Sequence, residues 1–151
     1  MRILVVEDIE QQGEWLCEKL RQLYKMAVVQ HVRTESEFHR LAEDFRNDPP
    51  ALAIIDMMLR WSDPAPDMPV APAEVNDGGR RAGLRCIEIL QSDPRSAGVP
   101  IIIRTVLEDI DFDNGELPPT IPLVTKESDS DDLFQLIDEA LRPARAAKRD
   151  Q

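Results

Sequence analysis

The chain has 151 residues, a mass of 17.1 kDa and a formal net charge of −11. That length fits one domain, and an apolar content of 42% is enough to fill a core. No apolar run approaches the ~20 residues of a membrane helix, and the first residues lack the pattern of a signal peptide. The two cysteines, Cys17 and Cys86, cannot build a disulfide framework or a zinc site. We therefore expect a cytoplasmic globular protein with no membrane partner.

The negative charge is concentrated in the last third of the chain. Residues 105–141 contain eleven Asp or Glu and one base, Lys126, and so carry −10 of the net −11. Such an acidic surface repels nucleic acid, so we expect no direct nucleic-acid partner, and it favours a downstream protein target that is basic. The closing residues, 143–151, are Ala-rich and basic, and we expect a frayed helix end or tail there.

The first third of the chain predicts three strands separated by two amphipathic helices. The apolar run at residues 2–6 indicates a buried strand, and apolar residues at helical spacing follow over 10–25. A β-branched run at 26–32 predicts the second strand. Thr34, with Glu three residues later, is the expected N-cap of the second helix. The third buried strand is expected at 51–55.

A segment of different composition follows the third strand. Residues 60–81 have no hydrophobic period, two glycines and four prolines, namely Pro64, Pro66, Pro69 and Pro72. We interpret this segment as a long proline-rich loop inserted into the domain, and not as a lid. Helical spacing resumes at residues 84–90.

Two further strands and one helix are expected in the last third. The strands are predicted at 100–104 and 121–125. Between them, residues 107–117 are acidic and are followed by Pro118 and Pro119, so any helix there is short or irregular. The last helix is predicted over 128–142, with Ser128 as its N-cap.

Five apolar strands that alternate with helices predict a parallel sheet covered on both faces. Right-handed crossovers then restrict the topology to a flavodoxin-like, doubly wound α/β domain. We assign this domain to residues 1–142, including the insertion at 60–81. In such sheets the ligand site lies beyond the carboxyl ends of the strands.

Polar residues follow four of the five predicted strands. Glu7 and Asp8 follow the first strand, Asp56 the third, Thr105 the fourth and Lys126 the fifth. Three clustered carboxylates repel one another and need a cation, and hard oxygen ligands suit Mg²⁺. A carboxylate beside a metal can attack phosphorus, while an ammonium group offsets the charge of the phosphoryl oxygens. The set predicts phosphoryl transfer onto Asp56.

At these segments the sequence resembles a known family. The resemblance is carried by Ile-Leu-Val-Val-Glu-Asp at 3–8, Ile-Ile-Asp-Met-Met-Leu at 54–59, Pro-Ile-Ile-Ile-Arg-Thr at 100–105, and Lys126. Together they resemble the receiver domain of bacterial two-component response regulators, over the whole chain except the insertion and the tail. Each segment alone is a weak signal, but their order, each directly after a strand, is a strong one.

The resemblance implies a site and a role for each of its residues. It implies that Mg²⁺ is held by Glu7, Asp8, Asp56 and the backbone carbonyl of Met58. It implies that Asp56 accepts a phosphoryl group from a histidine kinase or phosphotransfer protein. Thr105 and Lys126 would then respond to the phosphate, and the domain would regulate a partner protein. The protein would be no enzyme beyond its own phosphorylation and dephosphorylation.

The sequence departs from the family pattern at four places. Val106 stands where a small residue usually follows the threonine, which would narrow access to the site and slow both gain and loss of phosphate. Glu127 replaces the proline after the lysine, so the bond is trans in a reshaped loop, or cis at a cost of about 3–4 kcal/mol. Leu123 replaces the aromatic switch residue, and the fourth helix of the family is poorly encoded. These departures affect the output mechanism more than the phosphorylation chemistry.

Two other functions remain open at this level. The same departures fit a receiver-like interaction module that works without phosphorylation. A phosphatase that acts through an aspartyl-phosphate usually has a second Asp, two residues after the nucleophile, as its general acid and base. In this chain Met58 occupies that position. Taken singly, the site residues also have ordinary interpretations: Asp56 could merely end a strand, and Lys126 could be a surface lysine.

Overall fold

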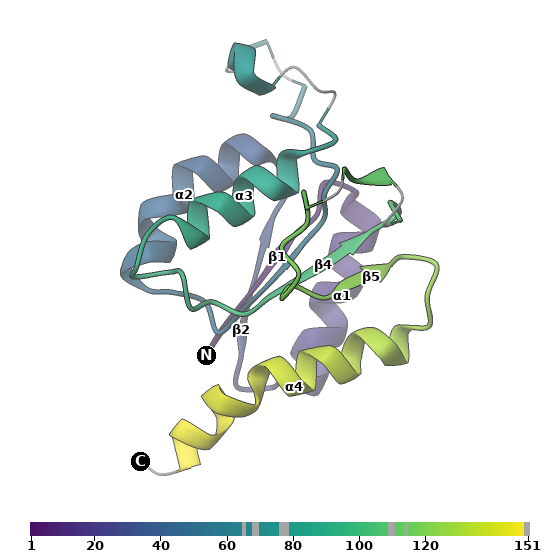
Figure 1. Cartoon of the computed structure of the whole chain (residues 1–151). Helices are drawn as coiled ribbons and strands as arrows, with labels where there is room; N and C mark the ends of the chain where they lie inside the picture. Colours follow the sequence, from purple (N-terminus) through teal and green to yellow (C-terminus); the bar gives the residue numbers. More distant parts are fainter. Residues whose placement is uncertain (65, 68–69, 76–78, 109–110, 114, 150–151) are drawn as a thin grey trace.

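The computed structural model describes residues 1–149 except 65, 68–69, 76–78, 109–110 and 114. Its five strands are β1 (Arg2–Val6), β2 (Val28–Val32), β3 (Leu52–Ile55), β4 (Ile101–Thr105) and β5 (Leu123–Thr125). They form one sheet in the order β2-β1-β3-β4-β5, and every neighbouring pair is parallel (Figure 1). The helices are α1 (Glu10–Leu23), α2 (Glu35–Asn47), α3 (Ala82–Gln91) and α4 (Ser130–Arg149), with a 3-10 turn, η1, at Ala73–Val75. The flavodoxin-like doubly wound fold is confirmed.

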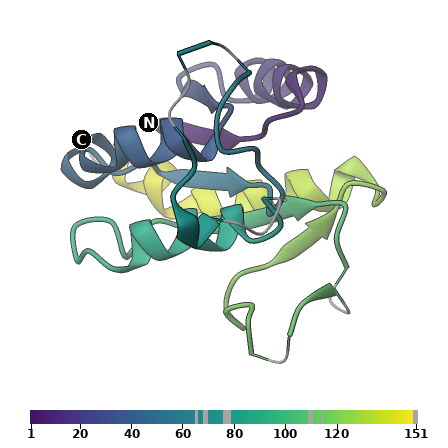
Figure 2. The same ribbon diagram turned by 90° about the horizontal axis from the view of Figure 1, so that it is seen from above.

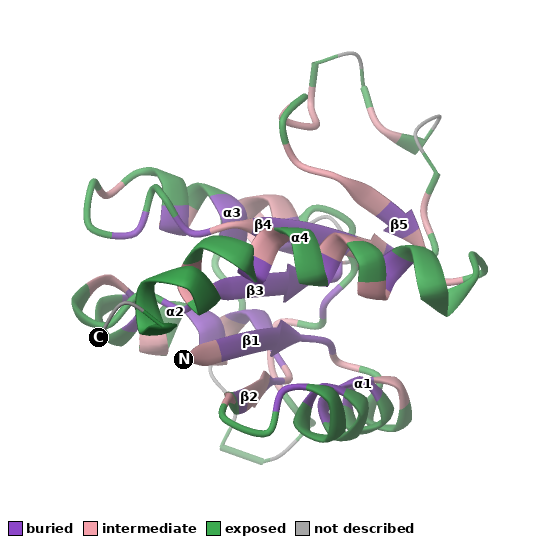
Figure 3. Cartoon of the chain, turned by 90° about the horizontal axis from the view of Figure 1, so that it is seen from below, coloured by how far each residue is buried: buried purple, intermediate pink, exposed green. Residues whose placement is uncertain are grey.

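Two apolar cores lie on the two faces of the sheet. Successive side chains of a strand point to opposite faces, so Leu4 and Val6 of β1 join one core while Ile3 and Val5 join the other. The helices α2 and α3 cover the first core, and α1 and α4 cover the second. Figure 3 shows the buried strands enclosed between these exposed helical surfaces. The helices therefore cover both faces of the sheet, and the strand ends lie at its edges.

The segment between β4 and β5 contains no α-helix among its described residues, and residue 111 has a 3-10 conformation. Figure 2 shows this segment as a loop that extends away from the sheet. The expectation of a degenerate fourth helix is confirmed for the described part, and residues 109–110 and 114 lie outside it. The acidic side chains and the proline pair disfavour a helix there, as the sequence predicted.

The insertion after β3 leaves the sheet at Leu59 and returns at Gly79. The Leu59 N–H donates to the Gly79 carbonyl at 3.2 Å, which closes the base of the insertion. Gly79 has a φ of +82°, and a Cβ there would lie 2.3 Å from the Leu59 carbonyl oxygen, so only glycine fits this closure. Residues 65, 68–69 and 76–78 of the insertion lie outside the described part.

The first residues of two helices test the expected caps. Thr34 accepts a hydrogen bond from the Glu37 N–H, so its role as the N-cap of α2 is confirmed. The expected N-cap Ser128 is wrong, because α4 begins at Ser130 and the Asp129 carboxylate accepts from the Asp131 N–H at 3.1 Å. An aspartate caps as well as a serine and adds a favourable charge at the helix N-terminus.

The last helix also ends later than expected. It continues past Arg142, through Pro143, to Arg149. Pro143 leaves the carbonyl of Glu139 without its helical donor, but residue 143 is exposed, so water can satisfy that carbonyl. The basic segment from 143 to 149 is therefore helical.

Candidate functional site

The three acidic residues that follow β1 and β3 converge at one edge of the sheet. Strands β1 and β3 are neighbours, and the Asp56 N–H donates to the Val6 carbonyl at 2.9 Å. Oxygen atoms of Glu7, Asp8 and Asp56 all lie within 4.8 Å of one another. Glu7 and Asp56 are buried, whereas Asp8 is partly open to solvent. The strand ends therefore assemble a carboxylate cluster with one accessible side.

Lys126 is the cation that bridges this cluster. Its ammonium nitrogen lies 2.7 Å from a Glu7 oxygen and 2.7 Å from an Asp56 oxygen, and its side chain is only 5% exposed. The Lys126 N–H donates to the Thr105 carbonyl at 2.8 Å, which fixes the loop after β5 beside the end of β4. Ion pairs that are buried this far are much less screened by salt than surface pairs. The lysine is thus part of the site and not a solvated surface residue.

The electrostatics of the cluster favour an additional cation. Burial raises the pKa of Glu7, and the Asp56 carboxylate raises it further. Hydrogen bonds from the Lys126 ammonium and the Ile9 N–H oppose this shift. The part of the rise that comes from Asp56 reflects repulsion between two neighbouring carboxylates, which a bound cation would relieve. Three carboxylates in this state form a donor set that fits a hard divalent cation such as Mg²⁺.

Arg104 is a second cation at the site, and the strand-end pattern of the sequence did not predict it. Its guanidinium lies 3.8 Å from Glu7 and 5.6 Å from the centroid of the Trp15 ring. Burial lowers the pKa of Arg104, while the charges of Glu7 and Asp56 oppose that shift. The sequence contained one signal for such a role, because Arg104 is the single charged residue in the apolar run of a buried strand. Because β4 alternates its faces, Arg104 reaches Glu7 from the side of α1.

The loop that carries Asp56 is held by the first turn of α3. The Gly83 N–H donates to the Met57 carbonyl at 3.0 Å. A Cβ at Gly83 would lie 2.4 Å from the Asp56 carbonyl oxygen. The helix α3 can therefore approach the backbone of Asp56 this closely only because residue 83 is glycine. The Met58 N–H donates to the Asp56 carboxylate at 3.2 Å. These contacts fix the orientation of the Asp56 side chain, whereas the Met58 carbonyl as a metal ligand stays a prediction.

Asp8 is held by the first residue of the insertion. The Arg60 N–H donates to the Asp8 carboxylate at 3.1 Å, and the Arg60 guanidinium donates to the Asp8 carbonyl at 3.2 Å. The insertion therefore contacts the acidic cluster at its base.

The structure also places Thr105 and three residues that depart from the family pattern, Val106, Leu123 and Glu127. Thr105 is fully buried, and its hydroxyl accepts a hydrogen bond from the Leu107 N–H at 3.4 Å. Val106 is 53% exposed. Leu123 packs against the core under α2 and α3. The Lys126–Glu127 peptide bond is trans, which decides between the two alternatives that the sequence left open.

A second ionic group lies outside the acidic cluster, and the sequence did not predict it. Glu35, at the start of α2, is fully buried and accepts two hydrogen bonds from Arg85 of α3, at 2.7 and 2.8 Å. His39 lies 3.0 Å from the same carboxylate. Burial raises the pKa of Glu35, but the hydrogen bonds from Arg85 and His39 outweigh it and leave the pKa below its ordinary value. This ionic group joins α2 to α3.

Comparison with solved structures gives the class of the fold. The chain is similar to the signal receiver domain of a DNA-binding response regulator from Colwellia psychrerythraea 34H, with a TM-score of 0.69 and 16% identity, covering 94% of this chain and 98% of that chain. It is also similar to the receiver domain of a signal transduction histidine kinase from Syntrophus aciditrophicus, with a TM-score of 0.65 and 22% identity, covering 94% and 90%. Neither a protein-family model nor a curated protein matches the sequence.

A third similar structure is the receiver domain of a modulated diguanylate cyclase from Desulfovibrio desulfuricans G20, with a TM-score of 0.63, 21% identity and 97% coverage of both chains. At identities this low, the likeness establishes the fold of a signal receiver domain and leaves the chemistry to be argued from the site. Among the described residues, no helix is both long and apolar enough to cross a membrane.

Proposed function

We propose that this chain is a phosphorylatable switch of a two-component phosphorelay. Asp56 accepts a phosphoryl group from a histidine kinase or phosphotransfer protein with Mg²⁺, and the domain then regulates a partner protein. One observation carries the proposal: the buried Asp56 carboxylate shares the Lys126 ammonium with Glu7, inside a cluster of three carboxylates. That arrangement combines a nucleophile, a cation and a metal-binding donor set at the carboxyl ends of the strands.

The residues of the cluster divide the chemistry among them. A carboxylate oxygen of Asp56 attacks the phosphorus of the donor. The bond between the phosphorus and the donor nitrogen breaks, and an acyl phosphate forms on Asp56. Lys126 balances negative charge on the phosphoryl oxygens, and the Thr105 hydroxyl hydrogen-bonds one of them. Glu7, Asp8, Asp56 and the Met58 carbonyl would hold Mg²⁺, which supplies further charge stabilisation when bound.

The similar structures support a partner of the kinase type, since they include receiver domains of response regulators and of histidine kinases. Such relays operate inside the cell, so we place the protein in the cytoplasm. The surface around Lys126, which belongs to the acidic last third, supports a downstream target that is basic.

Intact-mass spectrometry after incubation with acetyl phosphate and Mg²⁺ tests the proposal. We expect one phosphoryl group on the wild-type chain and none on Asp56→Asn. Asp67→Asn, which changes an exposed aspartate in the insertion, is the matched control and should be phosphorylated like the wild type. Equal labelling of Asp56→Asn and wild type would refute the proposal.

A second candidate is a receiver-like module that binds its partner without phosphorylation. It is favoured by Leu123 in place of an aromatic switch and by the lack of an α-helix between β4 and β5 in the described residues. NMR spectra with and without beryllofluoride and Mg²⁺ separate the two candidates. Widespread shifts over residues 105–126 support the phosphorylatable switch, and shifts confined to the residues around Asp56 support the module.

A further inference from the structure

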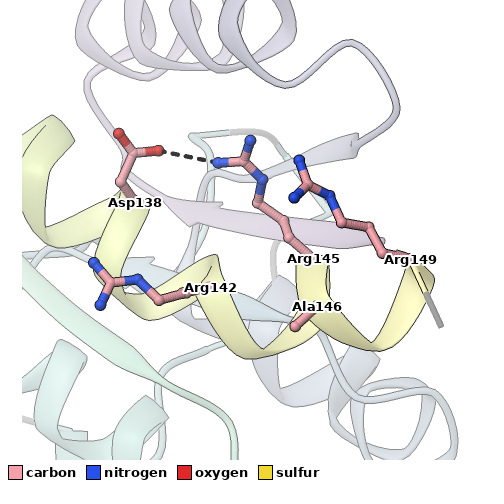
Figure 4. A pocket seen from close by; sticks show the side chains of 5 residues that line it. All are labelled: Asp138, Arg142, Arg145, Ala146 and Arg149. Carbon is pink, nitrogen blue, oxygen red and sulfur yellow. Dashed lines mark ion pairs between the residues drawn. The ribbon is translucent and has the colours of Figure 1, made fainter.

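A basic surface lies at the opposite end of the sheet from Asp56. The last turns of α4, residues 142–149, contain four Arg or Lys and no acid. Arg145 and Arg149 line a shallow pocket of about 350 Å³ on α4, and Figure 4 shows Arg145 reaching Asp138 at the rim. In the same view Arg149 lies beside Arg145, and Arg142 extends in another direction.

The same two arginines line a second hollow, of about 270 Å³, with Lys148 and the end of α1. Its apolar residues are unusually open to solvent: Leu23 is 58% exposed and Met26 is 82% exposed. Lys25 lies between them in sequence and adds another positive charge. We call these six residues the Arg145 surface: Leu23, Lys25, Met26, Arg145, Lys148 and Arg149.

The Arg145 surface is removed from the proposed phosphorylation site by the length of the sheet. Met26 shortly precedes Val28, the first residue of β2, so the surface lies at the amino ends of the strands. Asp56 follows the last residue of β3 and lies at the carboxyl ends. A partner bound at one end would leave the other end accessible.

The ordinary role of basic residues at a helix C-terminus does not explain the whole surface. Lys148 and Arg149 complement the helix dipole of α4. That role does not require Lys25, nor the two exposed apolar side chains of Leu23 and Met26 beside the arginines. Among the described residues, no carboxylate lies within ion-pair distance of Lys148 or Arg149, and the nearest rim acid, Asp138, is paired with Arg145 and with Tyr24.

We propose that the Arg145 surface binds an acidic, amphipathic segment of a partner protein. Carboxylates of that segment would pair with Arg145, Lys148 and Arg149, since guanidinium groups bind carboxylates through two parallel hydrogen bonds. Apolar side chains of the segment would cover Leu23 and Met26. This inference is independent of the proposed phosphorylation of Asp56.

The charge distribution selects a short segment over an extended polyanion. Apart from residues 142–149, the chain carries a large negative charge, most of it in residues 105–141. A nucleic acid or an anionic lipid bilayer extends beyond the basic surface and is repelled by the negative charge of the rest of the chain. A short segment experiences only charges within about one Debye length, roughly 8 Å in physiological salt.

Fluorescence anisotropy with a labelled helical peptide tests this proposal. The peptide carries Glu on one face and Leu on the other, and a second peptide has Gln in place of Glu. We expect saturable binding of the Glu peptide that weakens with salt, and at least about tenfold weaker binding of the Gln peptide. Arg145→Glu/Arg149→Glu should abolish binding, and Met26→Ser should weaken it.

The matched control is Arg40→Glu/Arg80→Glu, which makes the same change in net charge at two exposed arginines elsewhere. It should bind the Glu peptide nearly as well as the wild type, as should Asp56→Asn. Urea unfolding verifies that each variant is folded. Equal loss in the control pair, no binding of the Glu peptide, or tighter binding to anionic vesicles or to RNA than to the peptide would each overturn the proposal.

Discussion

The Lys126 ammonium and the Asp56 carboxylate form a buried ion pair at 2.7 Å, and the same nitrogen lies 2.7 Å from Glu7. The pair joins the ends of two strands, β3 and β5, that are not neighbours in the sheet. Between them lies β4, whose last carbonyl, at Thr105, accepts from the Lys126 N–H. Lys126 therefore joins the Asp56 carboxylate to the loop after β5, which precedes the acidic first turn of α4.

Lys126→Gln should destabilise the protein, because it leaves two buried carboxylates without their common cation. We expect a loss of about 1–3 kcal/mol in the free energy of unfolding without metal, measured by urea denaturation. Mg²⁺ should restore part of this loss, since it neutralises the same carboxylates. Lys19→Gln, at an exposed position of α1, is the control and should change little. A Lys126→Gln variant as stable as wild type without metal would show that the ion pair is unimportant.

Arg104→Met should strengthen Mg²⁺ binding. The guanidinium lies 3.8 Å from Glu7, so it repels a second cation at the cluster. Removing it should tighten Mg²⁺ binding about three- to tenfold in isothermal titration calorimetry at low salt. Arg40→Met, at an exposed arginine of α2, controls for net charge. Unchanged or weaker Mg²⁺ binding by Arg104→Met would contradict this role.

Gly83→Ala should disturb the loop that carries Asp56. The added Cβ would lie 2.4 Å from the Asp56 carbonyl oxygen, and a backbone atom cannot move aside cheaply. We expect a loss of about 1–3 kcal/mol in stability and slower phosphorylation of Asp56 by acetyl phosphate. The control is Gly98→Ala, since a Cβ at Gly98 meets nothing within 4 Å. Stability losses of equal size in the two variants would mean that the close approach of α3 is not the cause.

Glu35→Gln should destabilise the protein at neutral pH, by about 2–3 kcal/mol, because Glu35 is buried and accepts two hydrogen bonds from Arg85. The pKa of Glu35 is lowered in the folded protein, so its ionised form stabilises the fold at pH values above its ordinary pKa of 4.5. The contribution is lost as the pH falls below that value and passes through the lowered folded pKa.

The difference in unfolding free energy between wild type and Glu35→Gln should therefore shrink as the pH falls from 7 toward 3. The Glu35 carboxylate is contacted by the Arg85 guanidinium and by the His39 ring. Glu43→Gln, on the exposed side of α2, serves as the comparison variant, and its stability deficit at neutral pH should be much smaller. A constant difference across this pH range would show that the ionisation of Glu35 does not stabilise the fold.

The sequence predicted the acidic cluster because its residues are tied to strand ends. Glu7, Asp8 and Asp56 directly follow buried apolar runs, and the carboxyl ends of parallel strands meet at one edge. Lys126 was predicted for the same reason. The irregular segment after β4 was predicted from its prolines and acids, whose effect on helix formation is local.

The remaining features depend on tertiary contacts that no local pattern encodes. The need for glycine at position 83 arises because α3 packs against the backbone of Asp56. The burial of Glu35 depends on its ion pair with Arg85 of α3. The cap of α4 was mispredicted since Ser128 and Asp129 are both good N-caps, and only the packing of α4 chooses between them.

The central claim is that Asp56 becomes an acyl phosphate with the help of Mg²⁺. The most direct measurement is to treat the protein with acetyl phosphate and Mg²⁺, reduce it with borohydride, and map the peptides by mass spectrometry. Our account predicts that residue 56 is converted to homoserine, that the conversion disappears when EDTA replaces Mg²⁺, and that no other Asp is converted. Conversion at another carboxylate, or none at any residue in the presence of Mg²⁺, would contradict the account.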